Sequence, residues 1–393
     1  MRIAFTVLGN SRRSNYLDGD TLRYGNGGGS GTDGSSIIVA EQLAAHGHEV
    51  VMAIDRLETG LEQSYAEKGI HFNAGKKVRG VTYTNFEFDN VPNKEFDILI
   101  NSLWFSKYEE LPITVTKGLI YWCHMQWVYG IDEMMKYAAK HNLALGYVNI
   151  SNWEREMTLG PISHAQSKYA KVKTGLIPNP VMDDIIKEVL ATNPVKKSHK
   201  FVFHALWARG GNVAMEAVRQ LEYPDSEFHA FDYLMCIHGH PEPWFHLHNG
   251  VDKRTLFTHI AESDYFIYPL YTPYQDVHKD TFSCAVAEAV ALGAIVITYP
   301  LGALPENFDG YCAWLDWPPN TDPAKMQTEQ LTKDLEGKFN YTANIVEKIR
   351  HLEANPVIKE QYRAVGKNYV LENFNANKIG NMWETYINEL ISL

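Results

Sequence analysis

The sequence predicts an α/β protein made of two doubly wound, Rossmann-like domains that face each other across a cleft. Three observations carry this prediction. Short apolar runs alternate with segments of helical spacing, which is typical of parallel sheets with crossover helices. The alternation restarts near residue 200 after a break at residues 177–180, where two prolines interrupt regular structure. The 393 residues suffice for two domains that each have a core.

The first half of the chain opens with a buried strand at residues 3–8. A helix is predicted at residues 35–46, and a Gly-His turn leads from it into the next strand. Three more apolar runs later in this half have the length of strands rather than of helices. The further strands predicted here are residues 49–54, 96–101, 118–123 and 145–150.

The second half repeats the pattern. Residues 200–205 (KFVFHA) predict its first strand, and residues 211–221 (GNVAMEAVRQL) have helical apolar spacing. The remaining predicted strands are residues 228–233, 265–269 and 294–298, and a helix is predicted at residues 255–261. We assign residues 1–180 plus 375–393 to an N-terminal domain with a returning C-terminal helix, and residues 181–374 to a C-terminal domain.

Composition excludes several function classes. A formal net charge of -11 and a pI near 5.8 argue against nucleic acid as a partner. They also disfavour strong attraction to anionic lipid. No apolar run is long enough for a transmembrane segment or for the core of a signal peptide. The four cysteines, Cys123, Cys236, Cys284 and Cys312, have no metal-ligand spacing and predict reduced thiols. We therefore expect a cytoplasmic protein, or one peripheral to a membrane.

The segment from Asp280 to Gly293 carries the strongest functional signal. Seven residues separate the carboxylates of Asp280 and Glu288, and small residues open a predicted helix between them. The first turn of a helix presents backbone N–H groups that favour a phosphate. One acid on each side of a phosphate site can hold a hydroxyl-rich group. A nucleotide-sugar has this layout, with a ribose, a diphosphate and a hexose.

Two further motifs follow predicted strands. The glycine-rich run from Tyr24 to Ser36 includes Gly29, Ser30 and Gly31, and its backbone can approach an anion closely. A flexible surface loop explains this run about as well. Arg209 stands beside two glycines and suits a phosphate, although a solvated arginine at a helix start is the plain alternative.

His124 also follows a strand. It can hydrogen-bond a sugar hydroxyl or help to move a proton, and a structural histidine among aromatic side chains is an equal alternative. Asp18 and Asp20 form an acidic pair that can hold a divalent metal, but such pairs are common in polar loops. We assign no metal ligand. The segment from Gly302 to Phe308 (GALPENF) suits a rigid loop near the same site.

The order of these motifs resembles that of retaining glycosyltransferases of the GT-B fold, particularly family 4 (group 1). The resemblance runs from the glycine-rich loop and GHEV (47–50) to IPNPV (177–181). It continues through Arg209, the segment from Asp280 to Glu288 and the LPE that follows. It ends in Phe374 and MWETYINEL (382–390), which resemble the terminal helix that returns to the first domain. The resemblance implies that residues 1–180 plus 375–393 form the acceptor-side domain and residues 181–374 the nucleotide-sugar-binding domain.

The resemblance implies roles for individual residues. Glu288 is expected at the ribose hydroxyls, Asp280 near the transferred sugar, Arg209 at the diphosphate and His124 near the sugar. Thr281, Phe282, Ser283 and Cys284 would offer backbone N–H groups to the donor, and Gly29, Ser30 and Gly31 would lie near its phosphate. Two positions depart from the family pattern. Asp280 replaces a glutamate, and His204 replaces a second cation.

The activity implied is that of a retaining, metal-independent hexosyl- or pentosyltransferase with no cofactor beyond its nucleotide-diphosphate-sugar donor. The acceptor hydroxyl could belong to a glycan, a glycoprotein or a lipid-linked molecule. Two alternatives stay open. One is a sugar-nucleotide epimerase or phosphorylase on the same fold, and the other is an inactive module that only binds a sugar-nucleotide. The donor base and sugar, the linkage and the oligomeric state do not follow from the sequence.

Overall fold

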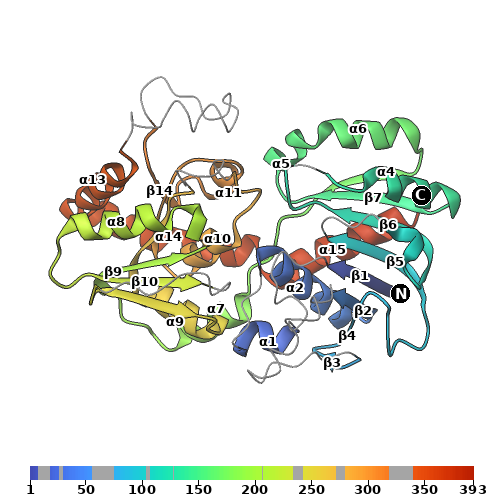
Figure 1. Ribbon diagram of the computed structural model, residues 1–393, viewed down its shortest axis with the longest axis horizontal. Coiled ribbons are helices and arrows are strands. Elements are labelled where there is room, and N and C mark those ends of the chain that lie inside the picture. Colours follow the sequence, from blue (N-terminus) through green and yellow to red (C-terminus); the bar gives the residue numbers. More distant parts are fainter. Residues whose placement is uncertain are drawn as a thin grey trace. The chain divides into compact units, whose positions relative to one another are not determined.

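The computed structural model describes residues 1–7, 18–25, 30–54, 75–102, 107–126, 128–205, 207–232, 242–270, 279–317 and 340–393. It divides into two compact units (Figure 1). Unit 1 contains Met1–Pro180 and Phe374–Leu393, and unit 2 contains Val181–Asn373. Each unit is an α/β layer structure with its own sheet.

Unit 1 is built on a sheet with the strand order β3-β4-β2-β1-β5-β6-β7-β8. Neighbouring strands are parallel except for the β3–β4 pair. The strands are β1 (Arg2–Val7), β2 (Glu49–Ile54), β3 (Lys77–Val78), β4 (Val81–Thr84), β5 (Glu95–Ser102), β6 (Thr114–Trp122), β7 (Ala144–Asn149) and β8 (Val172–Leu176). The helices are α1 (Gly19–Tyr24), α2 (Gly31–Ala45), η2 (Tyr108–Glu110), α4 (Ile131–Lys140), α5 (Asn152–Met157), α6 (Leu159–Lys168) and α15 (Ala376–Leu390).

Unit 2 has the strand order β11-β10-β9-β12-β13-β14, with every described pair parallel. Its strands are β9 (Lys197–His204), β10 (Glu227–Asp232), β11 (Phe245–Asn249), β12 (Ser263–Tyr268), β13 (Ile295–Thr298) and β14 (Cys312–Trp314). Its helices are α7 (Asp183–Ala191), η3 (Trp207–Arg209), α8 (Gly211–Leu221), α9 (Lys253–Glu262), α10 (Cys284–Ala291), α11 (Leu304–Phe308), α13 (Tyr341–Ala354) and α14 (Pro356–Asn373). If the strands of unit 2 are numbered 1 to 6 from β9 to β14, their order across the sheet is 3-2-1-4-5-6, which is the Rossmann arrangement.

Helices cover both faces of each sheet. In unit 1, α4 and α6 pack together over β6, β7 and β8, whereas α2 packs against β1, β2 and β4 (Figure 1). In unit 2, α8 and α13 pack together, while α9, α10 and α14 form a second layer. Burial on both faces explains why the inner strands read as continuous apolar runs in the sequence.

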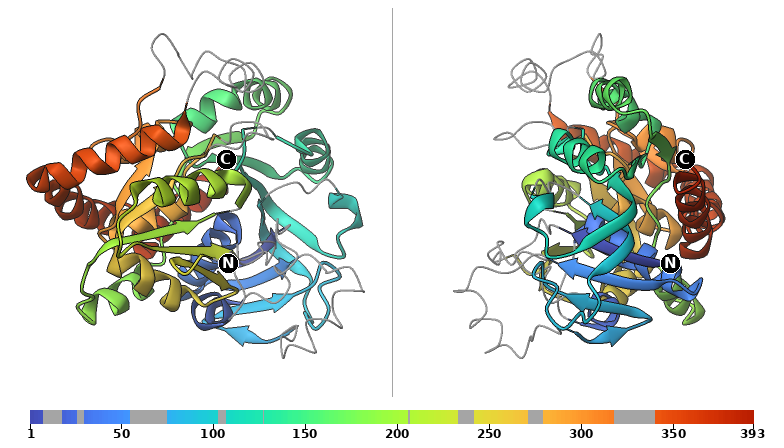
Figure 2. Two further views of the ribbon diagram at one scale, coloured as in Figure 1. Left: turned by 60° about the vertical axis from the view of Figure 1, so that its left-hand side comes forward. Right: turned by 90° about the vertical axis from the view of Figure 1, so that its right-hand side faces the viewer.

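The terminal helix α15 returns to unit 1 and packs beside α2, as Figures 1 and 2 show. Trp383 is fully buried and meets Trp122 edge-on at 4.7 Å between ring centroids. The Tyr386 hydroxyl donates a hydrogen bond to the Lys173 carbonyl (2.7 Å) and accepts one from the Tyr147 N–H (2.9 Å). These contacts bury large aromatic side chains, each of which contributes about 1.5–3 kcal/mol.

The predicted α/β class with two Rossmann-like domains is confirmed, and most predicted elements exist with bounds shifted by a few residues. The helix expected at residues 35–46 begins earlier, at Gly31, because Ser30 caps it. The helix expected to open with Thr281 begins at Cys284, so that Thr281 and Phe282 lie in the preceding loop. The rigid loop expected at residues 302–308 ends in the short helix α11. Among the described residues, no helix is long and apolar enough to cross a membrane.

Candidate functional site

The candidate site in unit 2 lies where the strand order reverses. β9 and β12 are neighbours in the sheet although β10 and β11 lie between them in sequence. In open α/β sheets, such a switch point leaves a crevice beyond the carboxyl ends of the strands. β9 ends at His204, Arg209 follows in η3, and Tyr268 is the last residue of β12. The topology therefore brings Arg209 and Tyr268 to one sheet edge.

Arg209, Tyr268 and Asp280 form a hydrogen-bonded triad at this edge. Arg209 Nη1 donates to the Tyr268 hydroxyl (2.8 Å) and to Asp280 Oδ1 (2.9 Å). The Tyr268 hydroxyl in turn donates to Asp280 Oδ2 (2.8 Å). Burial raises the pKa of Tyr268, so that its hydroxyl stays protonated and acts as a donor. Because both oxygens of Asp280 are bonded, the triad holds a guanidinium and a carboxylate in fixed orientation.

The backbone around Asp280 is held by the loop that follows β13. The Ala303 N–H donates to the Asp280 carbonyl at 2.8 Å. Gly302 has φ +60°, and a Cβ there would lie 2.3 Å from the same carbonyl oxygen. Only glycine permits this close approach. The GALPENF segment thus positions the first acid of the site, a role that its sequence alone did not reveal.

Helix α10 begins between the two acids. Its N-cap, Ser283, has the left-handed φ of +67°, and its hydroxyl accepts a bond from the Val286 N–H at 3.4 Å. Phe282 is 1% exposed and packs against Phe308, so its side chain belongs to the core. Any contact of Phe282 with a ligand would come from its backbone. Thr281, Ser283 and Cys284 are half-buried at the same helix end, where the helix dipole favours an anion.

Glu288 lies in the second turn of α10 and pairs with Lys253. The Lys253 ammonium lies 3.2 and 3.0 Å from the two carboxylate oxygens of Glu288. Glu288 is 5% exposed, and burial raises the pKa of its carboxyl, while Lys253 opposes that rise. Lys253 is the first residue of α9, directly after its N-cap Asp252. The charge of a lysine opposes the dipole at a helix N-terminus, so its anionic partner compensates an unfavourable position.

His204, at the end of β9, is a neutral neighbour of these charges. Burial lowers the pKa of His204 to about 3, and the positive charge of Lys253 adds to this effect. His204 therefore supplies no cation at neutral pH, in contrast to the residue that the family pattern has at this position. Lys253 is a cation within electrostatic range of it.

In unit 1, Ser30 and Gly31 lie at the N-terminus of α2. Ser30 forms a capping box with Asp33: the Asp33 N–H donates to Ser30 Oγ (3.2 Å), and the Ser30 N–H donates to Asp33 Oδ2 (2.9 Å). The hydroxyl and N–H of Ser30 are thus engaged in capping, and a phosphate would have to replace Asp33 to bond with them. Gly29 lies outside the described residues.

In unit 1, His124 is the second residue after the end of β6. It is 7% exposed and its ring lies 4.6 Å from that of Trp122. Burial lowers the pKa of His124 to about 3, so that its ring is neutral at physiological pH. A neutral ring can still donate and accept hydrogen bonds. Asp18, half of the acidic pair considered for a metal, caps α1 by accepting from the N–H groups of Asp20 and Thr21.

The structure thus unites Arg209 and Asp280 through Tyr268 and pairs Glu288 with Lys253. Neither Tyr268 nor Lys253 was predicted from the sequence. A tyrosine at the end of an apolar strand looks like any other core residue. The lysine right after an N-cap aspartate was the usable signal, because its charge is misplaced relative to the helix dipole. Cys123, Cys284 and Cys312, the cysteines that are described, are free thiols.

No protein-family model matches the sequence, and no curated protein matches it. Solved structures do match the fold. Sucrose-phosphate synthase from Thermosynechococcus elongatus is similar at a TM-score of 0.63 and 12% identity, with 100% of this chain and 99% of that one covered.

Two other solved structures give similar values. A glycosyltransferase involved in avilamycin A biosynthesis has a TM-score of 0.56 at 11% identity, covering 100% of this chain and 98% of its own. HepE from Anabaena, in complex with UDP and glucose, has a TM-score of 0.54 at 10% identity, covering 99% and 100%. The likeness extends over both units, and the chain therefore has the two-domain α/β fold of GT-B glycosyltransferases.

Proposed function

We propose that this protein is a glycosyltransferase that moves a sugar from a nucleotide-sugar donor to an acceptor hydroxyl. The Arg209–Tyr268–Asp280 triad is the observation that carries the proposal. It sets a cation and a hydroxyl-binding carboxylate beside the N-terminus of α10, at the switch point of a Rossmann sheet. HepE, which shares the fold, has been solved with UDP-glucose, and this supports a nucleotide-sugar as the donor.

Each acid then has one task in donor binding. Glu288 accepts hydrogen bonds from the ribose hydroxyls, and Lys253 keeps its carboxylate ionised in a buried place. Asp280 accepts hydrogen bonds from the transferred sugar. Arg209 and the start of α10 face the diphosphate. Lys253 supplies the second positive charge of the site, because the neutral His204 cannot supply it.

The proposed reaction follows from where charge develops. Breaking the bond between the anomeric carbon and the phosphate oxygen puts negative charge on the leaving diphosphate and positive character on the sugar. Arg209 and the α10 dipole stabilise the first of these charges. With retention of configuration, the acceptor attacks from the face that the diphosphate leaves, and a phosphate oxygen takes the acceptor's proton. Asp280 and Glu288 therefore need no acid/base role of the glycosidase kind, and we propose that transfer is metal-independent.

His124 and the start of α2 are the groups in unit 1 that we propose for donor binding. Because the His124 ring is neutral, it would hydrogen-bond a sugar hydroxyl rather than act as a proton donor of ordinary strength. The acceptor class remains a glycan, a glycoprotein or a lipid-linked molecule. We expect the protein in the cytoplasm or at a membrane surface.

The test is a binding screen of nucleotide-sugars, including UDP-glucose, followed by transfer assays with the donor that binds best. Glu288→Ala should abolish transfer while circular dichroism shows an intact fold, although the melting temperature should fall because Lys253 loses its partner. Glu347→Ala, on the exposed face of α13, is the matched control and should turn over normally. Near-normal turnover by Glu288→Ala overturns the assignment. The anomeric configuration of the product, read by NMR, tests retention separately.

Product analysis also tests the two alternatives. An epimerised or phosphorylated sugar without a glycosidic linkage identifies an epimerase or a phosphorylase. A donor that binds by calorimetry but is consumed with no acceptor identifies an inactive binding module. The aspartate at 280 and the neutral His204 are the two features that favour this last outcome.

A further inference from the structure

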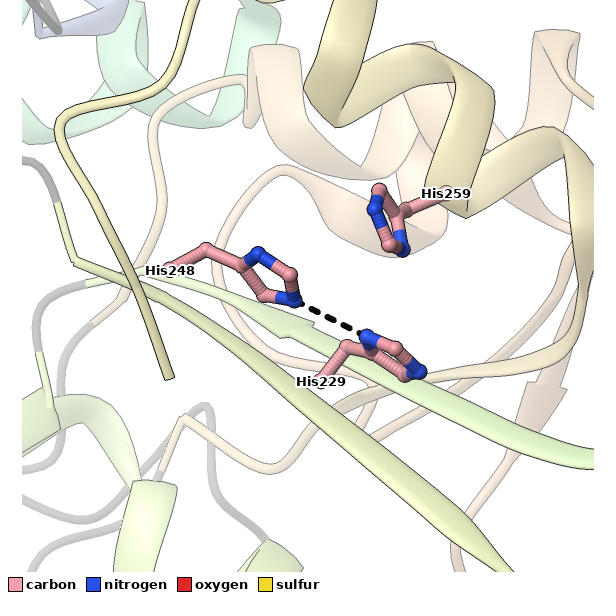
Figure 3. A group of neighbouring side chains, drawn as sticks. All are labelled: His229, His248 and His259. Atoms are coloured by element: carbon pink, nitrogen blue, oxygen red, sulfur yellow. Dashed lines mark hydrogen bonds between the residues drawn. The ribbon is translucent and has the colours of Figure 1, made fainter. Parts of the chain in front are cut away.

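Three histidines of unit 2 gather between two strands and a helix, as Figure 3 shows. His229 comes from β10, His248 from β11 and His259 from α9. β10 and β11 are parallel neighbours in which Phe231 lies opposite His248, so His229 and His248 project from the same side of the sheet. His259 points towards this pair from the helix above (Figure 3). The proposed donor site uses none of the three.

The ring nitrogens of this trio are close enough to share one ion. One nitrogen of each ring lies within 4.8 Å of those of the other two. His229 Nδ1 and His248 Nε2 are only 2.9 Å apart. Zinc binds imidazole nitrogen at about 2.0–2.1 Å, so two ligands of a tetrahedral zinc lie about 3.4 Å apart. The rings must therefore rotate from these positions for all three nitrogens to bind one ion.

The outer contacts of His229 are those of a metal ligand. Its Nε2 lies 3.1 Å from the Glu227 carboxylate, which can only accept, so this nitrogen carries the proton. The lone pair of His229 is therefore on Nδ1, the nitrogen that faces His248. A carboxylate that fixes the tautomer of a ligating histidine recurs in zinc sites. Figure 3 also shows that His259 directs one ring edge at the same point. His259 Nδ1 is buried and has no hydrogen-bond partner among the described residues.

Charged side chains near the trio both oppose and favour a bound cation. The ammonium of Lys200 is buried near the trio and opposes a bound cation, but Glu262 holds it at 2.7 Å and offsets part of that charge. A histidine ring binds a metal through the lone pair of a nitrogen that carries no proton, so His248 and His259 would ligate as neutral rings. His246 stacks on His229 with 4.7 Å between the ring centroids, but it does not belong to the group of three whose nitrogens could share an ion.

We propose that His229, His248 and His259 bind one divalent transition-metal ion, of which Zn²⁺ fits best, with solvent at the fourth position. Imidazole ligands select borderline metals of this kind rather than Mg²⁺ or Ca²⁺. Binding releases no net proton, because the ring proton of His248 moves from Nε2 to Nδ1 by exchange with solvent. The ion would tie α9 to β10 and β11, and none of the residues proposed for sugar transfer would hold it.

The experiment uses the full chain without a histidine tag, treated with a chelator and then dialysed. Zn²⁺ binding is measured by calorimetry, and Co²⁺ binding by the visible absorption of a tetrahedral site. We expect one equivalent of either ion, and a higher melting temperature with Zn²⁺. His229→Gln and His259→Gln should remove the stoichiometric site. Glu227→Gln keeps all three ligands and should weaken binding about 10–100-fold.

His164→Gln is the matched control, because His164 is exposed on α6 and distant in sequence from the trio. It should bind the ion as the wild type does. Wild-type protein that binds less than one equivalent overturns the proposal, as does undiminished binding by His229→Gln or His259→Gln. If either variant fails to fold by circular dichroism, Glu227→Gln decides, and wild-type affinity in that variant counts against the site.

Discussion

Replacing Lys253 by methionine should destabilise unit 2 in a manner that depends on pH. The substitution keeps the aliphatic stem and removes the ammonium that lies 3.2 and 3.0 Å from the Glu288 oxygens. Lys253 is the group that opposes the rise in the pKa of Glu288. Loss of one partner of a buried ion pair costs about 3–5 kcal/mol. Glu288 can limit the cost by taking up a proton.

The free energy needed to protonate Glu288 sets the size of the destabilisation. The pKa of an unperturbed glutamate is 4.5, so at pH 7 protonation costs about 3.4 kcal/mol at 1.36 kcal/mol per pH unit. A folded-state pKa above the unfolded one means that the folded state binds more protons, and stability then falls as pH rises. The destabilisation by Lys253→Met should therefore approach about 3 kcal/mol at pH 7 and shrink below about 1 kcal/mol at pH 5.

Urea unfolding at pH 5, 7 and 8 measures this difference. Hydrogen exchange in peptides from α9 and α10 identifies which transition belongs to unit 2, because the two units need not unfold together. The double variant Lys253→Met with Glu288→Gln removes both charges and should recover most of the loss. An equal destabilisation at all three pH values, or none at pH 8, would refute the reasoning.

Three further predictions concern the sites in each unit. Gly302→Ala forces a Cβ to 2.3 Å from the Asp280 carbonyl and imposes φ +60° on alanine, so we expect a loss of about 1–3 kcal/mol in urea unfolding and weaker donor binding in calorimetry. Tyr268→Phe removes the hydroxyl that donates to Asp280 at 2.8 Å and should lower the free energy of unfolding by about 1–3 kcal/mol. Unchanged stability in urea unfolding and unchanged turnover would show that the triad is dispensable. The His124 ring should stay neutral in NMR titration down to about pH 4, because burial lowers its pKa to about 3. Since the unfolded ring binds protons first, stability should fall as pH drops below 6.5, and a ring that titrates near 6.5 in the folded protein would contradict its burial.

The sequence alone determined the inner strands of both sheets. Strands such as β1, β9 and β12 are buried on both faces, so each appears as an apolar run of strand length. Edge strands are different. β8 and β11 are partly exposed and mix polar with apolar residues, and their patterns did not stand out.

The sequence also determined the two acids, since seven residues between Asp280 and Glu288 place one ahead of α10 and the other in its second turn. Which partner each acid receives was decided by the tertiary structure. Tyr268 reaches Asp280 because β12 lies beside β9, and Lys253 reaches Glu288 because α9 packs against α10. His229, His248 and His259 likewise meet only through strand register and helix docking. Periodicity along a chain reports which side chains are buried. Strand order decides which of them meet, and that order results from the packing of the whole sheet.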